Sequence, residues 1–238
     1  MKMRTIGIDG CRAGWLGVSL DQREEYFWLI ESDIELRHLF ETFDCVFIDI
    51  PIGLQENMAS RTCDDLLRRV LGSNYHSSVF SPPVRSALLT NEYKVACDIN
   101  EAKTGKRISI QSWNITPKII AVDTILQENR NLSKSVLESH PELLFKKLNR
   151  GKESLDKKKT DSGLEQRLAL LNNEYPGSAN LYQKIRSRFL KKQVADDDIT
   201  DALVLAYFAS KAPDKPIRTL PLPAEVDSTG LPMAIHFV

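Results

Sequence analysis

The sequence predicts an α/β fold whose mixed five-stranded core sheet, with three antiparallel strands first and parallel strands after them, is flanked by helices and carries a helical insertion. Three observations predict it. Short segments with alternating apolar residues open the chain, a wholly apolar run suited to a doubly buried strand comes next, and segments with helical periodicity fill most of the remainder.

Strands are predicted for three segments near the start of the chain: residues 4–10, 14–21 and 25–31. Ile6 and Ile8 alternate with other residues in the first segment, as in a strand with side chains on two faces. Only short polar breaks separate the segments. Neighbouring strands joined by such short breaks pair antiparallel, so we expect an antiparallel trio.

A helix and a fourth strand follow. Ser32 and Glu35 have the spacing of a capping box, which predicts a helix through Phe43. Residues 45–50 then form a short apolar run, typical of a strand that is buried on both faces. The predicted order up to this point is three strands, one helix and one strand.

The rest of the chain reads mainly as helix. Residues 54–131 are interpreted as a mainly helical insertion, with helices at 61–71, 92–104 and 115–128, within a single domain that spans residues 1–238. A fifth strand at 135–139 is followed by three helices, at 141–148, 164–172 and 197–210. The last helix is apolar nearly all round, so we expect it to be buried.

Charge and cysteine usage exclude several classes of protein. The 32 basic and 32 acidic residues cancel, so the chain as a whole exerts no long-range attraction on nucleic acid or on an anionic membrane. No apolar run approaches the ~18 residues that span a bilayer, and we expect a soluble cytoplasmic protein without a membrane partner. The four cysteines lack zinc-ligand spacing, which predicts reduced, structural thiols.

The charge is nevertheless uneven along the chain. Residues 146–192 contain 13 basic and 5 acidic residues, whereas residues 1–60 contain 5 basic and 11 acidic residues. Solvated helix faces are one interpretation of the basic segment. A local surface that binds a polyanion is the other, and it predicts salt-dependent binding.

Four aspartates stand at positions that favour chemistry. Asp9 and Asp49 each come where an apolar strand ends, and ligands of α/β sheets gather at such ends. Asp198 and Asp201 lie on one face of the last predicted helix. Each strand-end acid can also be a turn residue, and acids in a first helical turn can be caps. Asp201 lies within the apolar run, so we expect it to have a cation partner.

Carboxylates without clustered His or Cys suit hard cations with oxygen ligands, namely Mg²⁺ or Mn²⁺. Two such ions can stabilise the attacking and leaving oxygens of a phosphoryl displacement. The sequence therefore predicts a two-metal site and phosphodiester hydrolysis.

Several short motifs give the chain a resemblance to a known family. They are GIDGCRAGW at 7–15, IDIPIG at 48–53, RTCD at 61–64 with Arg69, SVFSPP at 78–83, ESHPE at 138–142, KTDSG at 159–163 with Arg167, and DDITDA at 197–202. The two strand-end aspartates, the element order and a last helix with Asp198-x-x-Asp201-Ala-Leu resemble the ribonuclease H superfamily, and this helix is similar to that of Holliday-junction resolvases. The closest resemblance is to domain of unknown function family 429, whose members are described as predicted nucleases of the ribonuclease H-like fold.

This resemblance implies roles for individual residues. The implied metal ligands are Asp9, Asp49, Asp198 and Asp201, with Glu138 as a further catalytic acid. His140 is either a proton shuttle or a histidine satisfied beside a helix start. Basic residues in the matching stretches and in the insertion are assigned to substrate binding: Arg61, Arg69, Arg85, Lys159 and Arg167.

Three functions remain as hypotheses. The first is a metal-dependent nuclease acting on DNA or RNA, with a homodimer left open. The second is an ATP-dependent phosphotransferase of the related actin-like and sugar-kinase fold, which needs two such domains. The third is a non-catalytic scaffold protein that binds nucleic acid and keeps its carboxylates for folding.

Overall fold

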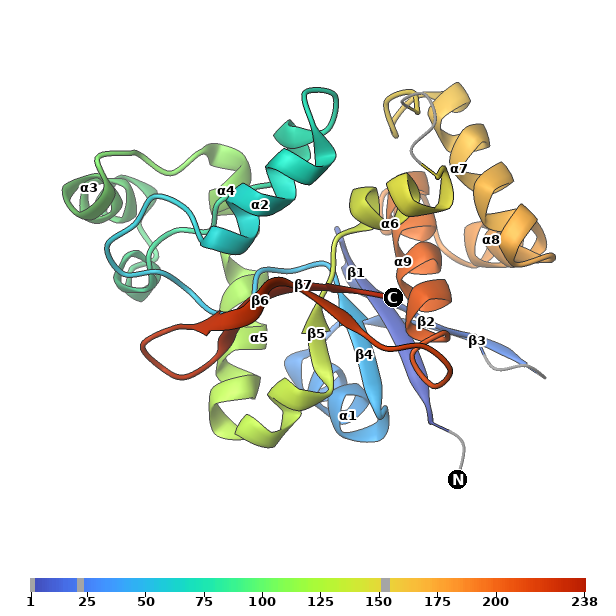
Figure 1. Ribbon diagram of the computed structural model, residues 1–238, viewed down its shortest axis with the longest axis horizontal. Helices are drawn as coiled ribbons and strands as arrows, with labels where there is room; N and C mark the ends of the chain where they lie inside the picture. Colours follow the sequence, from blue (N-terminus) through green and yellow to red (C-terminus); the bar gives the residue numbers. More distant parts are fainter. Residues whose placement is uncertain (1–2, 21–23, 151–154) are drawn as a thin grey trace. The chain divides into compact units, whose positions relative to one another are not determined.

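The computed structural model describes residues 3–20, 24–150 and 155–238, and these residues confirm the α/β class. Their main sheet has five strands in the order β3-β2-β1-β4-β5 (Figure 1). The strands are β1 (Thr5–Cys11), β2 (Gly14–Leu20), β3 (Glu25–Ile30), β4 (Cys45–Ile48) and β5 (Val136–Glu138). The first three pair antiparallel, and β4 and β5 extend the sheet in parallel with β1, as predicted.

The chain divides into two compact units. The first comprises Met1–Asp49, Ser135–Arg218 and His236–Val238, and it contains the five-stranded sheet. Its helices are α1 (Asp33–Thr42), α6 (Pro141–Leu148), α7 (Asp161–Glu174), α8 (Ser178–Arg188) and α9 (Asp196–Ala209). The predicted capping box of α1 is present, because Ser32 Oγ accepts the Glu35 N–H and the Glu35 carboxylate accepts the Ser32 N–H.

The second unit comprises Ile50–Lys134 and Thr219–Ile235, and the predicted insertion lies within it. Its helices are α2 (Thr62–Leu71), α3 (Tyr93–Thr104), α4 (Ile110–Asn114) and α5 (Thr116–Glu128), with short 3₁₀ segments at His76–Ser78, Arg85–Leu89 and Arg130–Lys134. A β-hairpin of β6 (Arg218–Val226) and β7 (Pro232–Phe237) also contributes to it. The sequence pattern does not predict this hairpin, since Pro221 and Pro223 in β6 cannot donate backbone hydrogen bonds.

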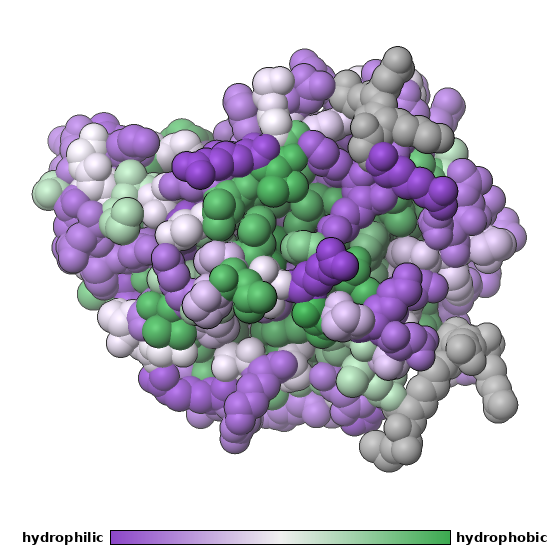
Figure 2. Space-filling model, viewed as in Figure 1, coloured by the Kyte–Doolittle hydropathy of each residue, from purple (hydrophilic) through white to green (hydrophobic). Residues whose placement is uncertain are grey.

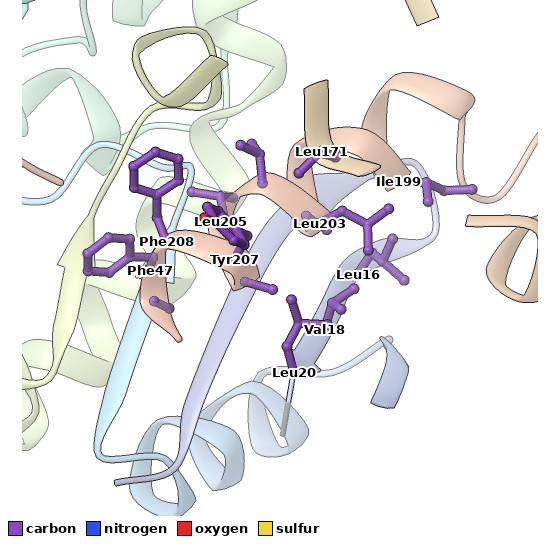
Figure 3. Close-up of a cluster of buried hydrophobic side chains, with 14 of the residues drawn as sticks. Leu16, Val18, Leu20, Phe47, Leu171, Ile199, Leu203, Leu205, Tyr207 and Phe208 are labelled. Carbon is purple, nitrogen blue, oxygen red and sulfur yellow. The ribbon is translucent and has the colours of Figure 1, made fainter. Parts of the chain in front are cut away.

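The core of the first unit lies between the sheet and α9. Every residue from Ile199 to Ala209 is buried, as the all-round apolar pattern predicts. The helix packs against β1, β2 and β4, and α6, α7 and α8 pack against it in turn. Figure 3 shows side chains of β2, β4, α7 and α9 meeting in this cluster, among them Leu16, Val18, Phe47, Leu171, Leu203 and Phe208.

A glycine lets α9 approach the sheet closely. A Cβ atom at Gly7 would lie 2.1 Å from the backbone nitrogen of Ala206, a distance that no side chain tolerates. Gly7 therefore faces α9 and brings the helix backbone against β1. Residues that alternate with Gly7, such as Ile6 and Ile8, point to the other face of the sheet and are fully buried there.

Candidate carboxylate site

Asp9 lies on the face of the sheet that α9 covers. It follows Gly7 by two residues, and side chains two apart on a strand share a face. Asp9 is only 6% exposed, and the Asp198 and Asp201 carboxylates lie near enough to act on its charge. The end of β1 therefore meets the first turns of α9.

Asp49 stands beside Asp9 on the neighbouring strand. Gly7 is in register with Phe47 in the parallel β1–β4 pair, and the Asp49 N–H donates to the Ile8 carbonyl oxygen at 3.1 Å. Continuing this register by two residues places Asp9 next to Asp49, at the usual strand spacing of about 4.8 Å. Phe47 belongs to the core cluster under α9, so Asp49 faces the same side.

The first turn of α9 contributes three carboxylates with different partners. Asp198 accepts the Ala195 N–H at 2.7 Å and so caps the helix. Asp196 accepts hydrogen bonds from Tyr182 and Lys191, at 2.8 and 2.7 Å. Asp197 lies 3.7 Å from the Lys158 ammonium. The capping interpretation thus holds for Asp198, whose charge also acts on Asp9.

Asp201 is the most buried of the four predicted ligands. Its side chain is 2% exposed, and Lys158 Nζ donates to its Oδ2 at 2.7 Å. Lys158 is thus the cation partner that the sequence leads us to expect. The second oxygen, Oδ1, is buried and has no hydrogen-bond partner among the residues that the structure describes.

The carboxylates repel one another electrostatically. Burial, and then the charges of Asp201, Asp49 and Asp198, hold the pKa of Asp9 well above its ordinary value, against the opposing effect of Lys158. Burial and the Asp201 charge raise the pKa of Asp49 to about 7. Burial raises the pKa of Asp198 to about 6 despite its hydrogen bond from Ala195. Full ionisation of the cluster is therefore unfavourable near neutral pH without a further cation.

The site has the chemistry of a hard-cation site without a preformed geometry for one. All its donors are carboxylate oxygens, and the unpartnered Oδ1 of Asp201 is available to a cation. Within residues 3–20, 24–150 and 155–238, no group of three or more His, Cys, Asp or Glu side chains is arranged to hold a metal ion. Two of the carboxylates that such a group needs are already engaged, Asp201 by Lys158 and Asp198 by the Ala195 N–H.

Glu138 is placed away from these aspartates. It is in register with Ile48, so its side chain points to the face of the sheet opposite Asp49. Glu142, in the same motif but on α6, does act on Asp49. Its charge raises the pKa of Asp49, with a smaller effect than burial or the Asp201 charge. Arg167 Nη2 donates to both Glu142 oxygens, at 2.8 and 3.0 Å. His140 precedes α6, and its carbonyl oxygen accepts the first hydrogen bonds of that helix.

The five residues assigned to substrate binding fall into two groups. Three are held in ion pairs within the protein: Arg61 with Asp64, Arg85 with Asp123 and Asp227, and Arg167 with Glu142. Arg61 and Arg167 are each 1% exposed, so a substrate phosphate does not reach them without local opening. Arg69 and Lys159 are exposed, and the substrate-binding prediction now depends on them.

Two members of the site have no signal of their own in the sequence. Lys158 stands in a run of three lysines, and nothing in the run distinguishes it from Lys157 or Lys159. Glu142 occupies the first turn of a helix, where an acid is expected for electrostatic reasons alone. For Lys158, the useful signal is Asp201 itself, because a buried acid requires a cation from elsewhere in the chain.

Other sequence-based expectations can be compared with the structure directly. The four cysteines are free and buried, in agreement with reduced structural thiols. Among the described residues, no helix has both the length and the apolar character that crossing a membrane requires.

Comparison with known proteins identifies one family. A family model described as "Protein of unknown function (DUF429)" matches residues 7–226, nearly the whole chain. Neither a curated protein nor a solved structure matches. The match includes both strand-end aspartates and the predicted ligands of α9, Asp198 and Asp201. The chain belongs to the DUF429 family.

Proposed function

We propose that this protein is a metal-dependent nuclease that hydrolyses phosphodiester bonds in nucleic acid. The observation that supports this proposal best is the convergence of Asp9, Asp49 and Asp201 from two strand ends and one helix, with a buried Asp201 oxygen that lacks a partner. Such a cluster is unfavourable for folding and is expected where charge is needed for chemistry.

The charge balance of the cluster favours a bound cation. Asp9, Asp49, Asp198 and Asp201 act on one another, and Lys158 is the ammonium that opposes them. A divalent ion offsets the remaining repulsion, and oxygen-only donors select Mg²⁺ or Mn²⁺. Asp9, Asp49 and Asp201 would hold it, together with Asp198 once its carboxylate leaves the helix cap.

The chain's own residues provide rigidity and orientation. When bound, Mg²⁺ or Mn²⁺ supplies Lewis-acid activation of a phosphoryl group and a more acidic water. Asp9 and Asp49 belong to adjacent paired strands under a helix that is buried from Ile199 to Ala209, so their positions are fixed before a substrate arrives. Preorganised charges of this kind favour a transition state that accumulates negative charge.

The basic segment favours a polyanionic substrate over a small phosphate ester. Exposed cations follow one another along the loop before α7, on α8 and just after it: Lys157, Lys159, Lys184, Arg188, Lys191 and Lys192. The surface over α7 and α8 is largely hydrophilic in the view of Figure 2. Lys184 is paired with Glu25 and Lys191 with Asp196, and both side chains remain largely exposed. Several exposed cations on neighbouring elements suit a polyanion better than a single anion.

A cleavage assay tests the proposal. Wild type is expected to cut DNA, RNA or junction substrates in the presence of Mn²⁺ or Mg²⁺, and Asp9→Asn is expected to lower the rate by about 100-fold or more. The metal-free variant should be as stable as wild type or more so, because one repelling carboxylate is removed. Glu41→Gln, a similar neutralisation on the exposed side of α1, is the control. Absence of metal-dependent cleavage, or full activity of Asp9→Asn, contradicts the proposal.

A binding assay tests the nucleic-acid partner separately. Lys159→Gln should reduce the slope of log affinity against log salt by about 0.7–0.9, the release expected for one phosphate contact. Lys94→Gln removes an exposed charge outside the basic segment and should leave the slope unchanged. A slope that Lys159→Gln does not alter returns Lys159 to the solvated-face interpretation.

The two alternative functions make different demands on the structure. A phosphotransferase of the actin-like fold needs a second copy of the core sheet, and the strands of the described second unit are those of the β6–β7 hairpin. ATP-dependent thermal stabilisation would favour it. The scaffold alternative is favoured by the cap at Asp198 and the buried Arg167–Glu142 pair, which stabilise the fold. A protein that binds metal and nucleic acid but does not hydrolyse the nucleic acid would support the scaffold alternative.

A further inference from the structure

The Lys158 side chain occupies the carboxylate site from a loop. Its Nζ lies 2.7 Å from Asp201 Oδ2 and 3.7 Å from Asp197 Oδ2, and its charge also acts on Asp9 and Asp49. The side chain is 37% exposed, whereas Asp201 is 2% exposed. The ammonium thus enters the site from solvent and reaches the most buried carboxylate.

The backbone around Lys158 is anchored, so that only its side chain is free to move. The Lys157 carbonyl oxygen accepts hydrogen bonds from the N–H and the hydroxyl of Thr160, at 2.9 and 2.8 Å. It also packs against Gly163, where a Cβ atom would lie 2.1 Å from it. The Asp156 carbonyl oxygen accepts from Arg167 at 2.9 Å. Departure of the ammonium therefore requires rotation of a flexible four-carbon side chain and no rearrangement of the backbone.

Asp201 provides a second and independent observation. One of its oxygens is bound by Lys158, and the other is buried without a partner among the described residues. An ammonium is a point charge and satisfies the carboxylate incompletely. A divalent cation with several oxygen ligands satisfies it better.

We propose that Lys158 is a tethered cation that fills the carboxylate site in the metal-free protein and leaves it when a divalent ion binds, so that ammonium and metal compete for Asp201. This inference rests on the metal site of the proposed function. It also gives a physical reason why the metal-free side chains are not arranged as a metal-binding group: Lys158 holds Asp201 by one oxygen.

The competition couples the metal to a polyanion. Lys158 also lines a small open cavity of about 170 Å³, whose other charged lining residues are Lys159, Lys191 and the acids Asp161, Asp196 and Asp197. Its ammonium therefore has a solvent-facing position to move to. A phosphate that attracts the ammonium there vacates Asp201. By linkage, polyanion and metal then raise each other's affinity.

The first test uses the wild-type protein and lysine labelling. Brief acetylation by acetic anhydride, read by mass spectrometry, reports how accessible each amine is. Saturating Mn²⁺ is expected to increase the labelling rate of Lys158 several-fold and to leave Lys157, which is exposed on the same loop, unchanged. Equal labelling of Lys158 with and without bound Mn²⁺ overturns the inference, and so does failure of Mn²⁺ to bind at all.

The second test uses Lys158→Gln, with Lys157→Gln as a matched loss of charge one residue away. Titration calorimetry is expected to show Mn²⁺ binding at least about tenfold more tightly to Lys158→Gln than to wild type, and Lys157→Gln close to wild type. Without metal, Lys158→Gln should melt below wild type, and Mn²⁺ should raise its melting temperature more than that of wild type. If Lys158 only stabilises the fold, the difference in melting temperature between Lys158→Gln and wild type should be the same with and without Mn²⁺.

These measurements separate the inference from the proposed function. Tighter Mn²⁺ binding by Lys158→Gln without cleavage of any nucleic acid supports the competition and contradicts the nuclease. Cleavage by wild type, with equal or weaker Mn²⁺ binding by Lys158→Gln, supports the nuclease and contradicts the competition. If Lys158→Gln fails to fold, the labelling result decides alone.

Discussion

In the metal-free protein, Asp49→Asn is expected to be more stable than wild type, and this advantage should grow as the pH rises from about 4 to about 7. Burial and the Asp201 charge raise the pKa of this carboxyl from 3.8 to about 7 in the folded protein. The folded state therefore binds a proton that the unfolded state has released over this pH interval. Stability falls from about pH 4 to about pH 7 for this reason, and the full penalty persists above pH 7. Asp49→Asn removes the ionisation and with it the penalty.

The size of the effect follows from the same interval. At about 1.4 kcal/mol for each pH unit, the difference between 3.8 and about 7 corresponds to about 4 kcal/mol at most. Asp49 is half-buried, and water screens part of the repulsion, so we expect a gain of about 2 kcal/mol at pH 8 and almost none at pH 4. A gain of this size is a large fraction of the stability of an ordinary domain.

Urea denaturation in EDTA at several values between pH 4 and pH 8 measures this difference. Glu41→Gln removes a carboxylate from the exposed surface of α1 and should differ from wild type by a small amount that pH changes little. A variant Asp49→Asn that is less stable than wild type at pH 8 refutes the reasoning, because the carboxylate then stabilises the fold. A gain that does not depend on pH refutes it as well, since ionisation is then not its cause.

Two further predictions concern the scaffold around the site. Gly7→Ala places a Cβ atom 2.1 Å from the Ala206 nitrogen and should lower the free energy of unfolding by about 3 kcal/mol or more. Gly105→Ala has open space around it and should lose only about 1 kcal/mol, because its φ is positive. Thermal melts of the two variants compare these losses. Arg167→Met leaves the Glu142 charge buried without its partner and should destabilise by about 3–5 kcal/mol, and adding Glu142→Leu should restore much of this in a double-mutant cycle. A mild Arg167→Met phenotype with weakened nucleic-acid binding would instead support its assignment to substrate.

The succession of main-sheet strands along the chain could be predicted because local patterns agree with the fold there. Alternating Ile6 and Ile8 mark β1, and the predicted ends of the five strands lie within two residues of the observed ones. Helix α8 lacks such a pattern. It buries only a narrow stripe that includes Leu181, Tyr182 and Ile185, and most of its other residues are polar, so the apolar signal is weak.

The candidate site could be predicted only in part, because some of its features are local in sequence and others depend on contacts between distant segments. Asp9 and Asp49 are recognisable because each ends its own apolar strand, and this is a local property. Which face a side chain takes depends on register with a distant strand. The resemblance adds Glu138 to the four aspartates, but its register with Ile48 points it to the other face of the sheet. The partners of buried charges, such as Lys158 for Asp201, are also set by tertiary packing alone.

The contact between β1 and α9 affects how the protein is made. Asp9 and Asp201 are 192 positions apart in sequence, so a ribosome has synthesised β1 long before it reaches the helix that covers it. Until then the apolar underside of the growing sheet is exposed, and the acidic cluster is incomplete. Such long-range closure slows folding and leaves a nascent chain that benefits from chaperone protection. Because α9 comes late in the chain, a truncated translation product that lacks it carries Asp9 and Asp49 without Asp201. Such a product should have none of the activity proposed for the complete site.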